Sequence, residues 1–261
     1  MGVEFSKEQK VRYRDTMNEL LSFTNACLGI CRHFEPPIET TEQALHGLRI
    51  ALDLWERPSI VELYLEQCER PSCNHADFET ARQWRNALRG PFFVKSCRGY
   101  CAEFLYHETL FEVWSMNRMW DDMIRHTPDI VYTTLIPFDG LIVSDGFLLN
   151  HGCSACGPGL QRLGHQRAKA LAKGVVTSAE EFARVAETLN AERKSGLMEV
   201  NDAAIFMDYV ERLNDSCEET CIPYGVLESE VPKLLRPRNN HSRVLNPELV
   251  RLAFVKARTG S

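Results

Sequence analysis

The sequence has no apolar run long enough to cross a membrane. A transmembrane helix needs about 20 apolar residues, and the longest run here, residues 141–149, is interrupted by Ser144, Asp145 and Gly146. The first ten residues also lack the apolar stretch of a signal peptide. We therefore predict a cytoplasmic protein with no membrane partner, in which the ten cysteines are thiols or metal ligands rather than disulfides.

The sequence also lacks the short motifs that mark common active sites. It contains no GxSxG, no GxxxxGK[ST], no HExxH and no GxGxxG after a predicted strand. It has no excess of positive charge, because 30 Lys and Arg residues are set against 36 Asp and Glu residues and the net charge is −6. These absences disfavour a globally basic nucleic-acid binder and leave no complete catalytic constellation to assign.

With 261 residues and 44% hydrophobic positions, the chain is long enough to bury a core of its own. Residues 1–90 have the three-to-four-residue apolar period of helices. The predicted helix starts are Ser6 and Ser59, each in a capping box with Gln9 or Glu62, together with Thr40 or Thr41 and Asp77. We expect the first helix to carry Cys27 and Cys31 on one buried stripe, and the fourth to end at Gly90.

The middle of the chain is predicted to form strands. Two β-rich runs, 130–138 and 141–149, are joined by Asp139-Gly140, the dipeptide typical of a two-residue type I′ hairpin, and this turn alone accounts for Asp139. Earlier strands are expected on both sides of Arg98-Gly99, with a register that stays open, followed by a turn at His107-Glu108. A short helix is predicted over 117–126.

A helical alternative exists for residues 92–116. In a helix, Glu103, His107, Glu108 and Glu112 would share neighbouring faces and form a metal centre of carboxylates and imidazole. The aromatic and β-branched residues of this segment favour strands instead, and strands remove that geometry.

The last part of the chain is again predicted to be helical. Helices are expected over 160–172, from Ser178 to Gly196, over 200–217 and from Asn246. The fold class that follows is α+β, with a small antiparallel β-sheet (about 92–148) packed between N-terminal and C-terminal helices. The corresponding regions are 1–90, 91–176 and 177–261, the last with a basic tail.

The strongest candidate for chemistry is a zinc site. Cys153 and Cys156 form a CxxC followed by glycine, and His151 and His165 lie close in sequence, so four soft or borderline ligands are available. The second ligand pair could instead be Cys217 with Cys221 or Cys97 with Cys101. A CxxC redox pair and simple packing of small thiols are the alternatives.

Three segments resemble an uncharacterised group of bacterial proteins: LIPFDGLIVSDGFL, GPGLQR, and AKA with GVVTSAEEF. The similarity covers about residues 92–182. Proteins of this group often carry a small cysteine-rich zinc motif like the one at the end of the secretion ATPase SecA, and the residues before Ser261 contain no such motif. The resemblance implies a hairpin followed by a helix and transfers no catalytic residue.

These observations predict a cytosolic interaction or regulatory protein with a protein partner and a structural zinc. One alternative is a metal-dependent hydrolase or nuclease whose ligands come from separated segments. The other is a nucleic-acid-binding protein that uses the tail at 231–261, where seven Lys and Arg residues accompany a single acidic residue, Glu248.

Overall fold

The computed structural model describes residues 4–69, 77–124, 127–150, 158–194, 198–199, 235–238 and 242–245. The chain divides into two compact units, Met1–Ala186 and Glu187–Ser261. In the second unit the described strands form a small antiparallel sheet of order β8-β10-β9, from Met198–Glu199, Ser242–Leu245 and Leu235–Arg238. The predicted helices over 200–217 and from Asn246 lie outside the described residues.

The first unit begins with helices, as predicted. They are α1 (Lys7–Leu28), α2 (Thr41–Glu56), α3 (Pro58–Cys68), α4 (Phe78–Gln83) and the short 3-10 helix η1 (Trp84–Asn86). The capping box of Ser6 is confirmed, and Thr40 and Asp77 are the other side-chain caps. The predicted capping box at Ser59 is wrong, because the N-cap of α3 is Arg57, two residues earlier, and Pro58 is the first residue of the helix.

The first helix is shorter than its apolar period predicts. It ends at Leu28 because Gly29 adopts the left-handed conformation and caps it. Cys31 therefore lies outside the helix, where it is buried, while Cys27 is exposed. The predicted stripe of Cys27 and Cys31 on one helix face is wrong.

The predicted fourth helix is also too long, because residues 88–90 belong to a strand. Strand β1 (Leu88–Arg98) pairs with β4 (Asp129–Phe138) from its first residue. Gly90 faces the ring of Tyr106 so closely that a Cβ atom would lie 2.6 Å from it. Long-range pairing thus overrides the local helical pattern before Gly90.

The strand prediction for the middle of the chain is confirmed. Strands β2 (Cys101–Tyr106) and β3 (Thr109–Trp114) flank the turn at His107-Glu108, so the helical metal centre does not form. The hairpin from β4 to β5 (Leu141–Ser144) turns at Asp139 and Gly140, whose φ angles are 49° and 80°. Positive φ at both positions is what a type I′ turn requires.

The sheet is a closed five-stranded mixed barrel, not the predicted small antiparallel sheet. The strand order is β1-β2-β3-β5-β4; β4 pairs antiparallel with β1 to close the barrel, and β3 pairs parallel with β5. The helix predicted over 117–126 is only α5 (Trp120–Met123), between β3 and β4. In an open meander the two outer strands would have unpaired backbone edges. Closure of the barrel pairs these edges with each other.

The barrel interior is filled by aromatic and aliphatic side chains. Ring pairs contact each other across it, with 5.8 Å between the centroids of Phe92 and Phe104 and 4.9 Å between those of Phe104 and Trp120. The register places these buried side chains inward: Phe92, Val94, Ala102, Phe104, Tyr106, Phe111, Val113, Val131, Leu135 and Ile142. These side chains form the core of the barrel.

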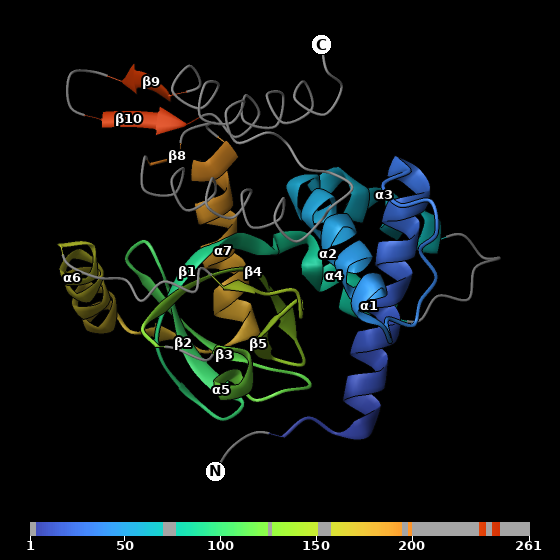
Figure 1. The fold of residues 1–261 in the computed structure, drawn as a ribbon, viewed down its shortest axis with the longest axis horizontal. Coiled ribbons are helices and arrows are strands. Elements are labelled where there is room, and N and C mark those ends of the chain that lie inside the picture. Colours follow the sequence, from blue (N-terminus) through green and yellow to red (C-terminus); the bar gives the residue numbers. More distant parts are fainter. Residues whose placement is uncertain are drawn as a thin grey trace. The chain divides into compact units, whose positions relative to one another are not determined.

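Helices cover the barrel from two sides (Figure 1). Helices α1 to α4 pack on one side, where Ile136, Phe138 and Val143 join their core. Helix α6 (Pro158–Lys173) lies on the other side against β3, and β7 (Val175–Val176) then pairs with β3. Helix α7 (Ala179–Lys194) follows and packs Phe182 on Phe111. The helices predicted over 160–172 and from Ser178 are thus present.

No helix within the described ranges is both long and apolar enough to cross a membrane.

The short strand β6 (Leu149–Asn150) pairs with β4 and completes the first sheet.

Candidate functional site

The predicted zinc ligands fall mainly outside the described residues. His151, Cys153 and Cys156 are not described, and neither are Cys217 and Cys221. His165 is described and lies exposed on α6. The zinc site therefore stays a prediction.

The alternative ligand pair, Cys97 with Cys101, is not brought together. In the register of β1 and β2, Cys97 lies opposite Ala102 and Cys101 lies opposite Arg98. Neighbouring strand residues point to opposite faces, so the two thiols do too. Burial raises the pKa of each thiol to about 11, which keeps both protonated at neutral pH. Within the described ranges, no group of three or more His, Cys, Asp or Glu residues could hold a metal ion.

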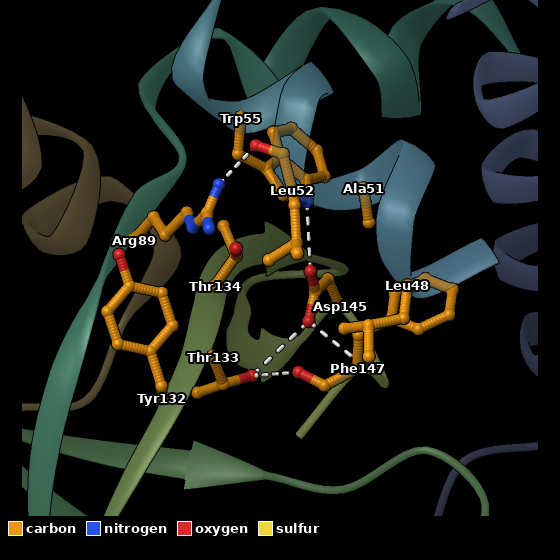
Figure 2. A pocket seen from close by; sticks show the side chains of 10 residues that line it. All are labelled: Leu48, Ala51, Leu52, Trp55, Arg89, Tyr132, Thr133, Thr134, Asp145 and Phe147. Atoms are coloured by element: carbon orange, nitrogen blue, oxygen red, sulfur yellow. Dashed lines mark hydrogen bonds between the residues drawn. The ribbon is translucent and has the colours of Figure 1, made fainter. Parts of the chain in front are cut away.

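Polar side chains meet in a small cavity between α2 and the barrel (Figure 2). The space open to the centre of a water molecule is about 10 Å³, which corresponds to a single water. Leu48, Ala51, Leu52, Trp55, Arg89, Tyr132, Thr133, Thr134, Asp145 and Phe147 line it.

Asp145 is the centre of this cavity. Its carboxylate is only 4% exposed and accepts hydrogen bonds from Trp55 Nε1 at 2.9 Å and from the Phe147 backbone N–H at 3.1 Å. The Thr133 hydroxyl lies 3.2 Å from the same carboxylate, and Thr134 also donates to it. The Thr133 hydroxyl has one proton, which it can donate either to this carboxylate or to the Phe147 carbonyl oxygen at 2.9 Å. The other contacts are donors, which suits an ionised acid.

Two opposing influences act on the acidity of Asp145. Burial raises the pKa of this carboxyl to about 6, and the hydrogen bonds and the nearby Arg89 partly offset the rise. Arg89 is itself 3% exposed; it donates to the carbonyl oxygen of Leu52, lies 3.5 Å from Glu56 and stacks over Tyr132. Arg89 is therefore paired with Glu56, and its positive charge also lowers the pKa of Asp145.

We call Trp55, Arg89, Thr133, Ser144 and Asp145 the polar joint. It connects α2 to β1, β4 and the end of β5, and the Tyr13 hydroxyl adds α1 by donating to the Ser144 carbonyl oxygen at 2.8 Å. A cavity for one water has no room for a substrate. We therefore interpret the polar joint as a buried structural contact that connects α2 to the barrel.

A second group of residues lies on the outer surface of β1, β2 and β3. Phe93, Leu105 and Leu110 form its apolar centre. Glu103 and Glu112 stand directly opposite each other on β2 and β3, an arrangement in which like charges repel. With Glu108 in the following turn, this surface is both apolar and negatively charged, and we call it the acidic face.

Helix α6 covers the acidic face. Leu163 and the buried Ala170 pack on its apolar centre. Arg167 pairs with Glu103, while Lys169 and Lys173 lie 2.9 Å and 2.8 Å from the carboxylate of Glu108. These lysines hold the pKa of Glu108 down at about 2.

Asp139 has more partners than its turn requires. It accepts hydrogen bonds from Gln9 and Arg12 of α1, and Arg12 also lies 3.3 Å from Asp77, the cap of α4. The prediction that the turn alone accounts for Asp139 was therefore incomplete.

Neither the polar joint nor the acidic face is visible as a motif in the sequence. Trp55 and Asp145 are 90 residues apart, and Arg89 lies where a helix is predicted. The alternation of Glu103, Leu105, Leu110 and Glu112 is readable, but it becomes one face only when the hairpin register is fixed.

Comparisons of the chain with family models, with curated proteins and with solved structures give no match. The resemblance of residues 92–182 to a bacterial group therefore stays a prediction.

Proposed function

We propose that this is a cytoplasmic interaction protein that uses the acidic face as its binding surface and α6 as the resident cover of that face. The observation that carries the proposal is the composition of the face. Apolar side chains at its centre favour a protein partner, and three carboxylates around them favour a cationic one.

The position of the face in the barrel supports the proposal. The strand order β1-β2-β3-β5-β4 with closure between β1 and β4 is that of the Greek-key barrels called OB-folds, which bind ligands on the face of their second and third strands. Strands β2 and β3 carry the acidic face here. Its carboxylates repel phosphate, so a nucleic acid does not suit this surface.

The contacts that hold α6 on the acidic face include ion pairs at the protein surface, which can be broken at low cost. Lys169 and Lys173 are 65% and 62% exposed, and exposed ion pairs contribute little to stability. Among the described side chains of α6, Ala170 is the only fully buried one. We expect release of α6 to leave its neighbours in place, because β7 pairs with β3 and Phe182 packs on Phe111 independently of the ion pairs of α6.

Charge reversal on α6 tests the proposal. We expect R167E/K169E/K173E to repel the helix from the acidic face, expose Phe93, Leu105 and Leu110, and increase the fluorescence of the dye ANS. Near-ultraviolet circular dichroism should remain that of the folded barrel.

The matched control is R14E/R82E/R85E, which makes the same change of charge at exposed positions on α1, α4 and η1. It should leave ANS fluorescence unchanged. If the α6 variant binds no more dye than the control, or unfolds as a whole, α6 is an integral part of the barrel and the proposal fails.

A further inference from the structure

We infer that the partner is a basic amphipathic helix that takes the place of α6 on the acidic face. This inference rests on the proposed function and adds the chemistry of the partner. Helix α6 is itself a basic amphipathic helix, and its side chains match the acidic face.

Helix α6 meets the face with a regular pattern of side chains. Leu163, Arg167 and Ala170 follow at i, i+4 and i+7, the spacing of one helix face. Lys169 and Lys173, four residues apart, lie along the edge that faces Glu108. A partner helix therefore needs an apolar residue, an arginine and a small residue at this spacing, with lysines beside them.

The arginine position is the most specific. Glu103 and Glu112 face each other across β2 and β3, and Arg167 pairs with Glu103. A guanidinium is a planar group with several donors and can serve two oxygen acceptors at once, while a lysine acts as a point charge. The partner should prefer arginine to lysine here.

The position of Ala170 sets a size limit. Its side chain is fully buried against the cluster of Phe93, Leu105 and Leu110. A larger residue would hold the helix away from the sheet. The partner should carry alanine, glycine or serine seven residues after its apolar anchor.

The barrel favours a helix over an added strand. Strand β2 is paired on both sides, by β1 and β3, and β3 is paired on both sides by β2 and by β5 and β7. Strand β2 therefore has no free edge for β-augmentation, and β3 is paired at Leu110, Phe111 and Trp114 on its side away from β2. A partner on the acidic face therefore contacts the side chains of the sheet and not its backbone.

The partner has to compete with a tethered helix. A segment of the same chain has a high effective concentration at its own site, so a free peptide binds weakly while α6 is in place. Binding should therefore become strong only when α6 is weakened, and the R167E/K169E/K173E variant supplies that state.

The test uses a fluorescein-labelled peptide with the sequence of residues 158–174 as a probe for the partner class. We expect saturable binding to the full-length R167E/K169E/K173E chain by fluorescence anisotropy, at least about threefold tighter than to the R14E/R82E/R85E control. Replacing the arginine of the peptide by lysine, or introducing Glu103→Gln into the chain, should weaken binding by about threefold or more.

A scrambled peptide of the same composition separates recognition from charge attraction. If it binds as well as the native order, or if neither peptide binds, the inferred partner class is wrong. A variant that binds ANS but not the peptide would keep the proposed surface and reject the helix. A variant that binds neither would reject both.

Discussion

Helices α2 and α6 both lie on the outside of the barrel, but they are attached by opposite means. Helix α2 is held through the polar joint, in which Asp145 and Arg89 are almost completely buried. Helix α6 is held by ion pairs at two exposed lysines and at Arg167, which is 20% exposed, around one small apolar cluster. A buried, fully hydrogen-bonded connection costs much to break, while an exposed ionic one costs little.

The difference suggests a division of labour within the first unit. The barrel and α2 form the fixed part, since their separation would leave charges and donors without partners in an apolar interior. Helix α6 forms the exchangeable part, since water and ions can replace its contacts with Glu108.

The largest effect is expected from Asp145→Ala. This change leaves the Trp55 indole N–H and the Phe147 backbone N–H without their acceptor and removes one of the negative charges near Arg89. The free energy of unfolding should fall by about 3 kcal/mol, measured by urea denaturation.

Asp53→Ala is the matched control, because Asp53 is on the same helix and pairs with Arg57 near the surface. Its cost should stay below about 1 kcal/mol. If the two variants lose the same stability, the polar joint does not hold α2.

Stability should also depend on pH through Asp145. Because burial raises the pKa of Asp145 to about 6, the folded protein binds a proton at this carboxyl more tightly than the unfolded chain. The group adds to the free energy of unfolding below about pH 4, and this contribution is lost as the pH rises through 6.

Between pH 4.5 and pH 7 this loss is about 2 kcal/mol. Asp145→Asn removes the titrating group, so the difference in unfolding free energy between wild type and variant should change by that amount over this range. A difference that is constant with pH would show that Asp145 has an ordinary pKa.

Glycine-to-alanine substitutions should have opposite signs in the two helices. A Cβ at Gly47 of α2 would lie 2.8 Å from Ile38 Cδ1 and 3.0 Å from the Phe147 ring, beside the polar joint. Gly47→Ala should therefore destabilise the protein by a net cost of up to about 1 kcal/mol, because the higher helix propensity of alanine offsets part of the cost of moving these side chains.

Gly164 of α6 has open space around the position of its Cβ. Gly164→Ala should stabilise α6 by up to about 1 kcal/mol, because alanine has the higher helix propensity. Thermal unfolding of both variants tests the pair, and a stabilising Gly47→Ala would show that α2 is not tightly seated.

How much of this structure is readable from the sequence depends on the range of the interactions. The turns at Asp139-Gly140 and His107-Glu108, and the caps at Ser6, Thr40 and Asp77, are local, and each was predicted. Each depends on side chains within a few residues of one another.

The errors come from contacts between distant segments. Residues 88–90 have a helical pattern, yet they pair with β4 more than 40 residues later. No local sequence pattern predicts the closure of the barrel. The same is true of the parallel pairing of Trp114 with Val143 and of the contact of Trp55 with Asp145. The polar joint and the acidic face could therefore not be predicted.

The smallest effect is expected from Glu112→Gln. It removes the repulsion between Glu112 and the opposite Glu103, and glutamine can still accept from Trp114 Nε1, which lies 3.3 Å from the carboxylate. The free energy of unfolding should rise by roughly 0.2 to 0.5 kcal/mol. Lys95→Gln is the control on β1, and a lower stability of Glu112→Gln would mean that this carboxylate is not repelled.

Native-state hydrogen exchange tests most directly whether α2 is fixed and α6 exchangeable. Backbone amides in α6 should exchange by local opening at least about 100-fold faster than the slowest amides of α2, and high salt should increase the exchange of α6 alone. Equal protection of both helices, unchanged by salt, would contradict the account and make α6 as permanent a part of the barrel as α2.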